Sequence, residues 1–150
     1  MAQALPNDLV VHPVNRKVPV ELAALCDVAE LGLRAVEARG LLGDDRPDLA
    51  LATLRRWCEG RCTVEELDAA AEEATEAVSL GFATPAALAY SAVDWLCLAA
   101  QDERPVLDDE VREWVLHNVR DALVALGEAR EAAAARASGA YRAALRRRRR

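Results

Sequence analysis

Two helix signatures stand back to back between residues 44 and 67, and they constrain the fold more than any other stretch of the chain. Asp45 offers a side-chain acceptor to exposed backbone N–H groups, and Pro47 follows where its missing N–H costs little. Gly60 is a left-handed stop for that helix. Thr63, with a glutamate three residues later, predicts a capping box for the next helix. Because so short a loop joins the two helices, we expect antiparallel neighbours.

The same helical pattern continues through the rest of the chain. Apolar residues recur at spacings of three and four, and glycines or a capping residue before a proline mark the ends. We predict helices over about 19–40, 45–60, 63–81, 84–101 and 108–127, with a helical extension over 128–145. Apolar residues make up 53% of the chain but aromatic residues only 4%, which favours close packing of helices over a sheet.

We therefore predict an all-α fold, a single-domain helical hairpin array or bundle of five to six helices. Its parts are an extended N-terminal arm over 1–18, an all-α helical domain over 19–140 and a basic C-terminal tail over 141–150. The stripe of the third helix is expected to include Val64, and Trp57, Trp95 and Trp114 are interpreted as core anchors. The predicted core comprises Leu22, Leu33, Leu54, Trp57, Leu67, Ala74, Trp95, Val115 and Leu126.

Charge is divided between an acidic body and a basic end. The formal net charge is −6, and five of the 19 basic residues form the terminal run 146–150. Without that run the chain carries 14 basic and 25 acidic residues, a net charge of −11. Such a body repels nucleic acid and attracts basic proteins. The arginine run is interpreted as a solvated tail, with binding to nucleic acid or an anionic surface as the alternative.

Targeting and membrane signals are not found in the sequence. The first twenty residues lack a basic leader and an apolar segment, and no apolar run approaches the roughly 20 residues of a membrane span. We therefore expect a cytoplasmic protein with no membrane partner. Its cysteines, Cys26, Cys58, Cys62 and Cys97, are then expected to be reduced thiols.

A metal or catalytic site is not expected either. Cys58 and Cys62 are four residues apart, and His12 or His117 would be needed to complete a metal site. Gly60 should end the helix between the two cysteines, and the second cysteine pair of a structural zinc site is missing. Neither histidine has an adjacent nucleophile in the sequence. The sequence predicts no enzyme, no cofactor and no metal.

The third predicted helix is the candidate binding surface. Between Thr63 and Leu80 the chain carries six acidic residues and no basic one. Such a face is usually a solvated surface, and that interpretation stays open. Helix surfaces commonly mix both signs for i,i+4 support, so a one-sign face also suits docking of a basic partner. The candidate partner-binding residues are Asp44, Asp45, Glu59, Glu65, Glu66, Glu72, Glu73 and Glu76.

Three segments in the first half of the chain resemble the immunity protein family called Imm-5-like: Asp45-Arg46-Pro47, the helix from Ala50 to Trp57 ending in Glu59-Gly60, and Thr63-Val64-Glu65-Glu66-Leu67. Cys26 is similar to a cysteine often placed early in the first helix, and the resemblance covers roughly residues 23–140. The family's fourth helix tends to carry histidines in a Thr-Ala-His segment, where this chain has Ser91 to Trp95. The resemblance implies a small helical protein that silences a toxin by occlusion, without catalysis.

Two functions from different classes follow as expectations. The first is an immunity-type protein whose acidic third helix docks on the basic surface of a toxin. The second is a structural adaptor or scaffold subunit of a larger bacterial assembly, which docks through its N-terminal arm or its basic tail. The oligomeric state is not predicted by the sequence.

Overall fold

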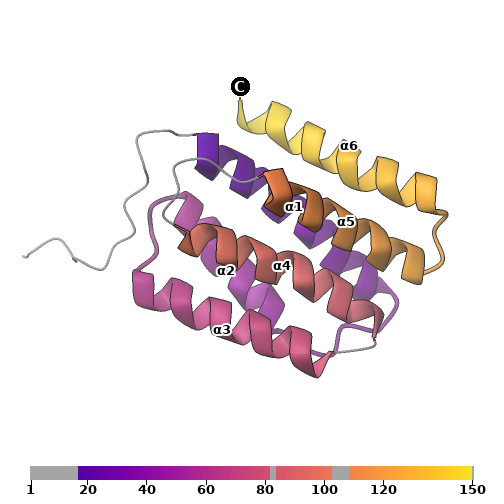
Figure 1. Ribbon diagram of the computed structural model, residues 1–150, viewed down its shortest axis with the longest axis horizontal. Helices are drawn as coiled ribbons and strands as arrows, with labels where there is room; N and C mark the ends of the chain where they lie inside the picture. Colours follow the sequence, from indigo (N-terminus) through magenta and orange to yellow (C-terminus); the bar gives the residue numbers. More distant parts are fainter. Residues whose placement is uncertain (1–16, 82–83, 103–108, 150) are drawn as a thin grey trace, which may run out of the picture.

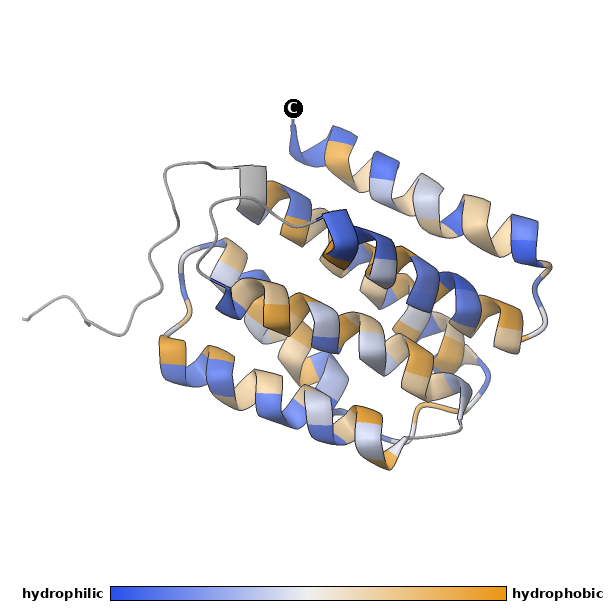
Figure 2. Ribbon diagram, in the orientation of Figure 1, coloured by the Kyte–Doolittle hydropathy of each residue, from blue (hydrophilic) through white to orange (hydrophobic). Residues whose placement is uncertain are grey.

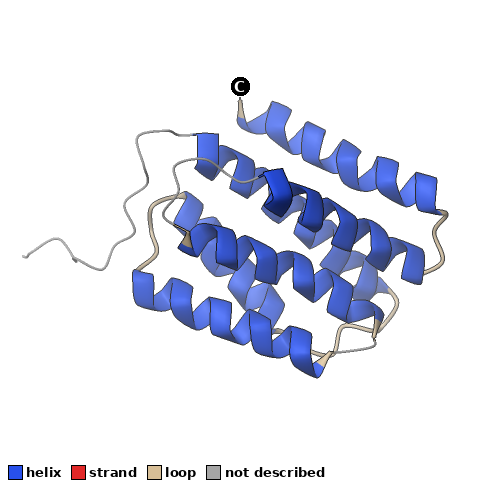
Figure 3. Cartoon of the chain, viewed as in Figure 1, coloured by secondary structure: helices blue, strands red, loops and turns tan. Residues whose placement is uncertain are grey.

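The computed structural model describes residues 17–81, 84–102 and 109–149, and helices occupy most of these ranges (Figure 1, Figure 3). In chain order the helices are α1 (Lys17–Ala38), α2 (Arg46–Cys58), α3 (Val64–Leu80), α4 (Pro85–Gln101), α5 (Asp109–Ala125) and α6 (Arg130–Arg148). No strand occurs within the described ranges. The predicted all-α bundle is confirmed. Residues 1–16, most of the predicted arm, lie outside the described residues, and Lys17 and Val18 already belong to α1.

Two central helices hold the bundle together. α1 packs against α2, α4, α5 and α6, while α4 packs against α1, α2, α3 and α5. α3 and α6 lie at opposite edges, and of the five other helices in the described ranges α3 packs on α2 and α4 (Figure 1). An edge helix of this kind leaves much of its surface facing away from the core.

Local capping signals explain where α2 and α3 end and begin. Gly60 follows α2 with φ +73°, the left-handed conformation that glycine adopts without strain. Thr63 accepts a hydrogen bond from the Glu66 backbone N–H at 3.1 Å, and the Glu66 carboxylate accepts from the Thr63 N–H at 3.3 Å. The predicted capping box is confirmed. At α2, Asp45 occupies the N-cap position but its side chain makes no capping bond, and Asp44 accepts from the Arg46 N–H instead.

Leucine, valine and alanine form the core, with Tyr90 as its largest fully buried side chain. All nine predicted core residues are buried except Trp95, which is half-buried against the core. Two expectations were wrong. Val64 is 45% exposed because it is the first residue of α3, and Trp114 is 44% exposed because it lies at the edge of the apolar stripe of α5. Figure 2 shows the hydrophilic outer residues of α3 and α5 beside the paler, more apolar α4.

The basic end of the chain is helical. α6 continues through the arginines to Arg148, across the predicted boundary between helical domain and tail. Arg147 and Arg148 contact the Asp27 carboxylate of α1 at 3.2 and 3.0 Å. Both side chains are nevertheless exposed to solvent, so this part of the run is solvated and at the same time belongs to an ordered helix that an acidic partner on α1 contacts.

Candidate functional site

The acidic residues of α3 lie on its outer surface, as expected. Glu65, Asp68, Glu72, Glu73 and Glu76 are exposed, opposite the buried Leu67, Ala70, Ala71, Ala74 and Ala77. Glu66 is half-buried because it belongs to the capping box. The 3.6-residue period of an amphipathic helix accounts for this division.

Two arginines of α2 neutralise part of that surface. Arg46 reaches Glu73 at 3.7 Å and Glu76 at 3.4 Å, while Arg56 contacts Glu66 at 2.7 Å. Hydrogen bonds from Arg56 and then from Thr63 hold the pKa of Glu66 below its usual range. Three of the candidate carboxylates thus bind α2 and help to orient α3.

The remaining candidate carboxylates separate into paired and free groups. Asp44 accepts hydrogen bonds from Arg46, the nearest one at 2.6 Å, and these bonds lower the pKa of Asp44. Glu59 pairs with Arg61. Asp45 is exposed, and Glu65 and Glu72 form no ion pair with any described residue. The structure therefore does not gather the eight candidates into one site; Glu65 and Glu72 are the ones most available to a partner.

A groove separates α3 from α4 on the same side of the bundle. Its lining includes Glu72 and Glu76 of α3 and Leu98 of α4, and its volume is about 570 Å³. Thr75 donates to Asp94 at 2.7 Å and Gln101 donates to Asp68 at 2.8 Å, which fixes α3 against α4 at two points. Leu98 is 50% exposed and lines this groove with Glu72, so an apolar side chain and a carboxylate without a described ion-pair partner share it.

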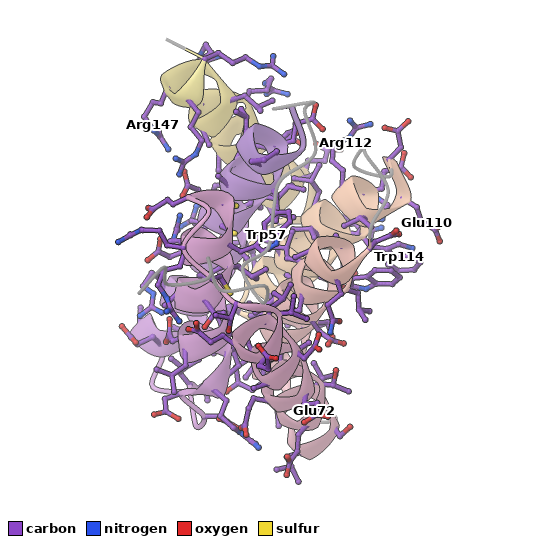
Figure 4. The ribbon with its side chains drawn as sticks, turned by 90° about the vertical axis from the view of Figure 1, so that its left-hand side faces the viewer. Trp57, Glu72, Glu110, Arg112, Trp114 and Arg147 are labelled. Carbon is purple, nitrogen blue, oxygen red and sulfur yellow. The ribbon has the colours of Figure 1, made fainter. Side chains whose placement is uncertain are left out.

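An aromatic pair extends this surface from α4 to α5. Trp95, one turn before Leu98, stacks on Trp114 with ring centroids 5.8 Å apart and planes 2° from parallel. The His117 ring meets Trp114 edge to face at 6.3 Å. Figure 4 shows Trp114 projecting from the side of the molecule, near Glu110. We call Glu65, Asp68, Glu72, Leu98, Trp95 and Trp114 the acidic-aromatic face.

Sequence reasoning missed the aromatic part of this face. Trp114 was assigned to the core because it lies near the apolar positions Val111 and Val115. Its polar neighbours could have indicated that Trp114 is exposed. Glu110 and His117 are four residues before and three residues after it, so they share its side of the helix.

Cys58 and Cys62, the pair weighed for a metal site, make different contacts. Cys62 is buried and its thiol donates to the Thr63 carbonyl at 3.3 Å, whereas the side chain of Cys58 interacts with that of Cys26. Among the described residues, no group of three or more His, Cys, Asp or Glu side chains is placed to hold a metal ion. His12 lies outside the described residues, and His117 contacts Trp114.

No helix in the described part of the chain combines the length and apolar character needed to cross a membrane. Comparisons with family models, with curated proteins and with solved structures found no match to this chain.

Proposed function

We propose that this chain is a non-catalytic protein-binding module of the cytoplasm, an immunity-type protein that neutralises a toxin by occluding its basic surface. The observation that carries the proposal is the Trp95–Trp114 stack, in which Trp114 is exposed and Trp95 half-buried, together with the α3 carboxylates that form no ion pair with a described residue. Tryptophan is enriched among residues that dominate binding energy, and surrounding charged residues steer the encounter.

Charge and shape of the face favour a basic protein as the partner. Leu98 lines the groove between α3 and α4 with Asp68, Glu72 and Glu76, and Trp114 lies at the surface near Glu110 (Figure 4). Protein interfaces likewise combine apolar and polar side chains. Carboxylates and tryptophan faces also both attract lysine and arginine side chains. The same carboxylates would repel nucleic acid.

Charge reversal at the two free carboxylates tests the proposal. The partner to test is the product of the gene next to that of this chain, with toxin neutralisation measured in cells and association measured by stopped flow. Glu65→Lys with Glu72→Lys should slow association about tenfold at low salt, because steering by a charged rim raises the rate by roughly 10–1000-fold. The difference should shrink as salt shortens the Debye length to about 8 Å.

A matched variant controls for net charge. Glu131→Lys with Ala132→Lys and Ala135→Lys changes the charge by the same amount at exposed positions on α6. It should leave the association rate nearly unchanged. Glu76 is left intact because its reversal would also break the contact with Arg46.

Equal effects of the test and control variants, or no effect of either, would show that α3 carries only a solvated surface. A partner from an assembly operon that binds through residues 1–18 or the arginine run would instead support the adaptor function.

A further inference from the structure

Two cysteines that are distant in the sequence lie next to each other where α1 packs on α2. Cys26 of α1 is fully buried, and Cys58 is the last residue of α2. The ion pair between Arg55 and Asp27, at 2.7 Å, joins the two helices beside these cysteines, and the neighbouring Cys58 thiol together with burial raises the pKa of the Cys26 thiol well above its ordinary value. Thirty-one residues separate the two cysteines along the chain, so only tertiary packing brings them together.

The two thiols differ in their access to solvent. Cys58 is half-buried and lines a groove of about 600 Å³, together with Arg55 of α2 and Arg147 and Arg148 of α6. Cys26 lies behind it in the core and does not line the groove. A small oxidant in the groove can therefore reach Cys58 directly, and Cys26 only after Cys58.

The other two cysteines lack this arrangement. Cys97 is fully buried, and burial raises its pKa to about 12. Cys62 is fully buried and its thiol donates to the Thr63 carbonyl. Buried cysteines without an accessible neighbour are chemically inert.

We propose that Cys58 and Cys26 form a redox modification site, in which a hydroperoxide oxidises Cys58 and Cys26 converts the product into a disulfide between α1 and α2. The pattern of an accessible cysteine beside a second, resolving cysteine is typical of thiols that respond to oxidants.

The chemistry balances with one hydroperoxide. The Cys58 thiolate attacks a peroxide oxygen, the O–O bond breaks, and the leaving oxygen departs as water or an alcohol after taking a proton. Cys58 is then a sulfenic acid. The Cys26 sulfur attacks the Cys58 sulfur, an S–S bond forms, the S–O bond breaks, and water leaves with the Cys26 proton. The two thiols lose two electrons in total and the peroxide gains them; a dithiol reductant reverses the reaction.

This site is separate from the acidic-aromatic face. In Figure 4, Arg147, which lines the groove, lies on the side of the molecule opposite Trp114 and Glu110. The proposal therefore does not rest on the proposed function, and either can fail without the other.

Hydrogen peroxide and intact-mass analysis test the site in the folded full chain. After mild oxidation and alkylation of the remaining thiols, we expect two of the four cysteines to be protected. Peptide mapping should show Cys26 linked to Cys58 with loss of two hydrogens, about 2 Da. Reduction with dithiothreitol should restore four reactive thiols on denaturation.

Three variants separate the roles of the cysteines. Cys26→Ala should stop the reaction at a sulfenic acid on Cys58 that dimedone traps, and Cys58→Ala should leave Cys26 unoxidised. Cys97→Ala is the matched buried control and should still form the disulfide. Circular dichroism checks that each variant is folded, and alkylation of folded wild-type protein gives a second measurement, with Cys58 at least about tenfold faster than Cys26.

A link between Cys58 and Cys62 would overturn the proposal. So would overoxidation of Cys58 to sulfinic acid while Cys26 stays a free thiol in folded wild-type protein.

Discussion

Trp57 and Trp114 differ in burial. Trp57→Ala should therefore reduce stability more than Trp114→Ala, whereas Trp114→Ala should reduce partner binding more. Trp57 is 4% exposed in the core between α2 and its neighbours, whereas Trp114 is 44% exposed and stacks on Trp95. Figure 4 shows Trp57 among the helices and Trp114 at the surface.

The expected costs follow from these positions. Trp57→Ala deletes a buried indole and leaves a cavity, which costs about 3–5 kcal/mol of unfolding free energy. Trp114→Ala removes a half-exposed ring and one stacking contact, which costs about 1–2 kcal/mol. At roughly 2–4 °C per kcal/mol for a chain of this size, the melting temperature should fall by about 10 °C for Trp57→Ala and about 4 °C for Trp114→Ala.

Binding should show the reverse order. As the aromatic centre of the acidic-aromatic face, Trp114 should contribute at least about 2 kcal/mol, so Trp114→Ala should weaken partner binding about 30-fold. Trp57→Ala, measured well below its melting temperature, should bind almost normally. Thermal melts followed by circular dichroism and titration calorimetry make both measurements. Equal losses of stability for Trp57→Ala and Trp114→Ala would contradict the difference in burial. Unchanged affinity of Trp114→Ala would show that the tryptophan pair is not part of the interface.

Two further variants test local features of the fold. Thr63→Ala removes the capping box of α3 and should cost about 1 kcal/mol in urea unfolding, while Thr63→Ser should retain most of the stability. Burial raises the pKa of Asp27, but hydrogen bonds and ion pairs with Arg55 and Arg148 outweigh burial and leave the pKa lowered. Its stabilisation is thus present above the unfolded pKa of about 3.9 and is lost as the pH falls through the lower native pKa, so Asp27→Asn should flatten the acid limb of the stability profile. Superimposable acid limbs for the two proteins would contradict this.

The ends of the helices were predictable from the sequence because capping acts within one turn. Thr63, Gly60 and Pro85 each work through their own backbone or that of residues a few positions away, so no tertiary information is needed. Asp45 shows where this reasoning weakens. Two adjacent aspartates compete for the same N-terminus, and only the structure shows that Asp44 makes the bond while Asp45 stays exposed.

The candidate site was only partly predictable because exposure at a stripe's edge and contacts between helices are tertiary properties. The acidic face of α3 followed from periodicity alone. The position of Trp114 depends on how far α4 covers α5, and the contact of Cys26 with Cys58 depends on how α1 packs on α2. The ion pairs of Asp27 with Arg147 and Arg148 likewise cannot be predicted from a run of arginines, because they depend on how α6 packs on α1.

The carboxylates of α3 divide into two roles, and this division decides what charge reversal can show. Among the described helices α3 packs on α2 and α4, and Arg46 and Arg56 of α2 hold it through Glu73, Glu76 and Glu66. Reversing any of these three places a positive charge beside an arginine, so a loss of binding would mix displacement of α3 with loss of steering. Glu65 and Glu72 have no such partner among the described residues. Only their reversal changes the charge presented to a partner while leaving the contacts that position the helix in place.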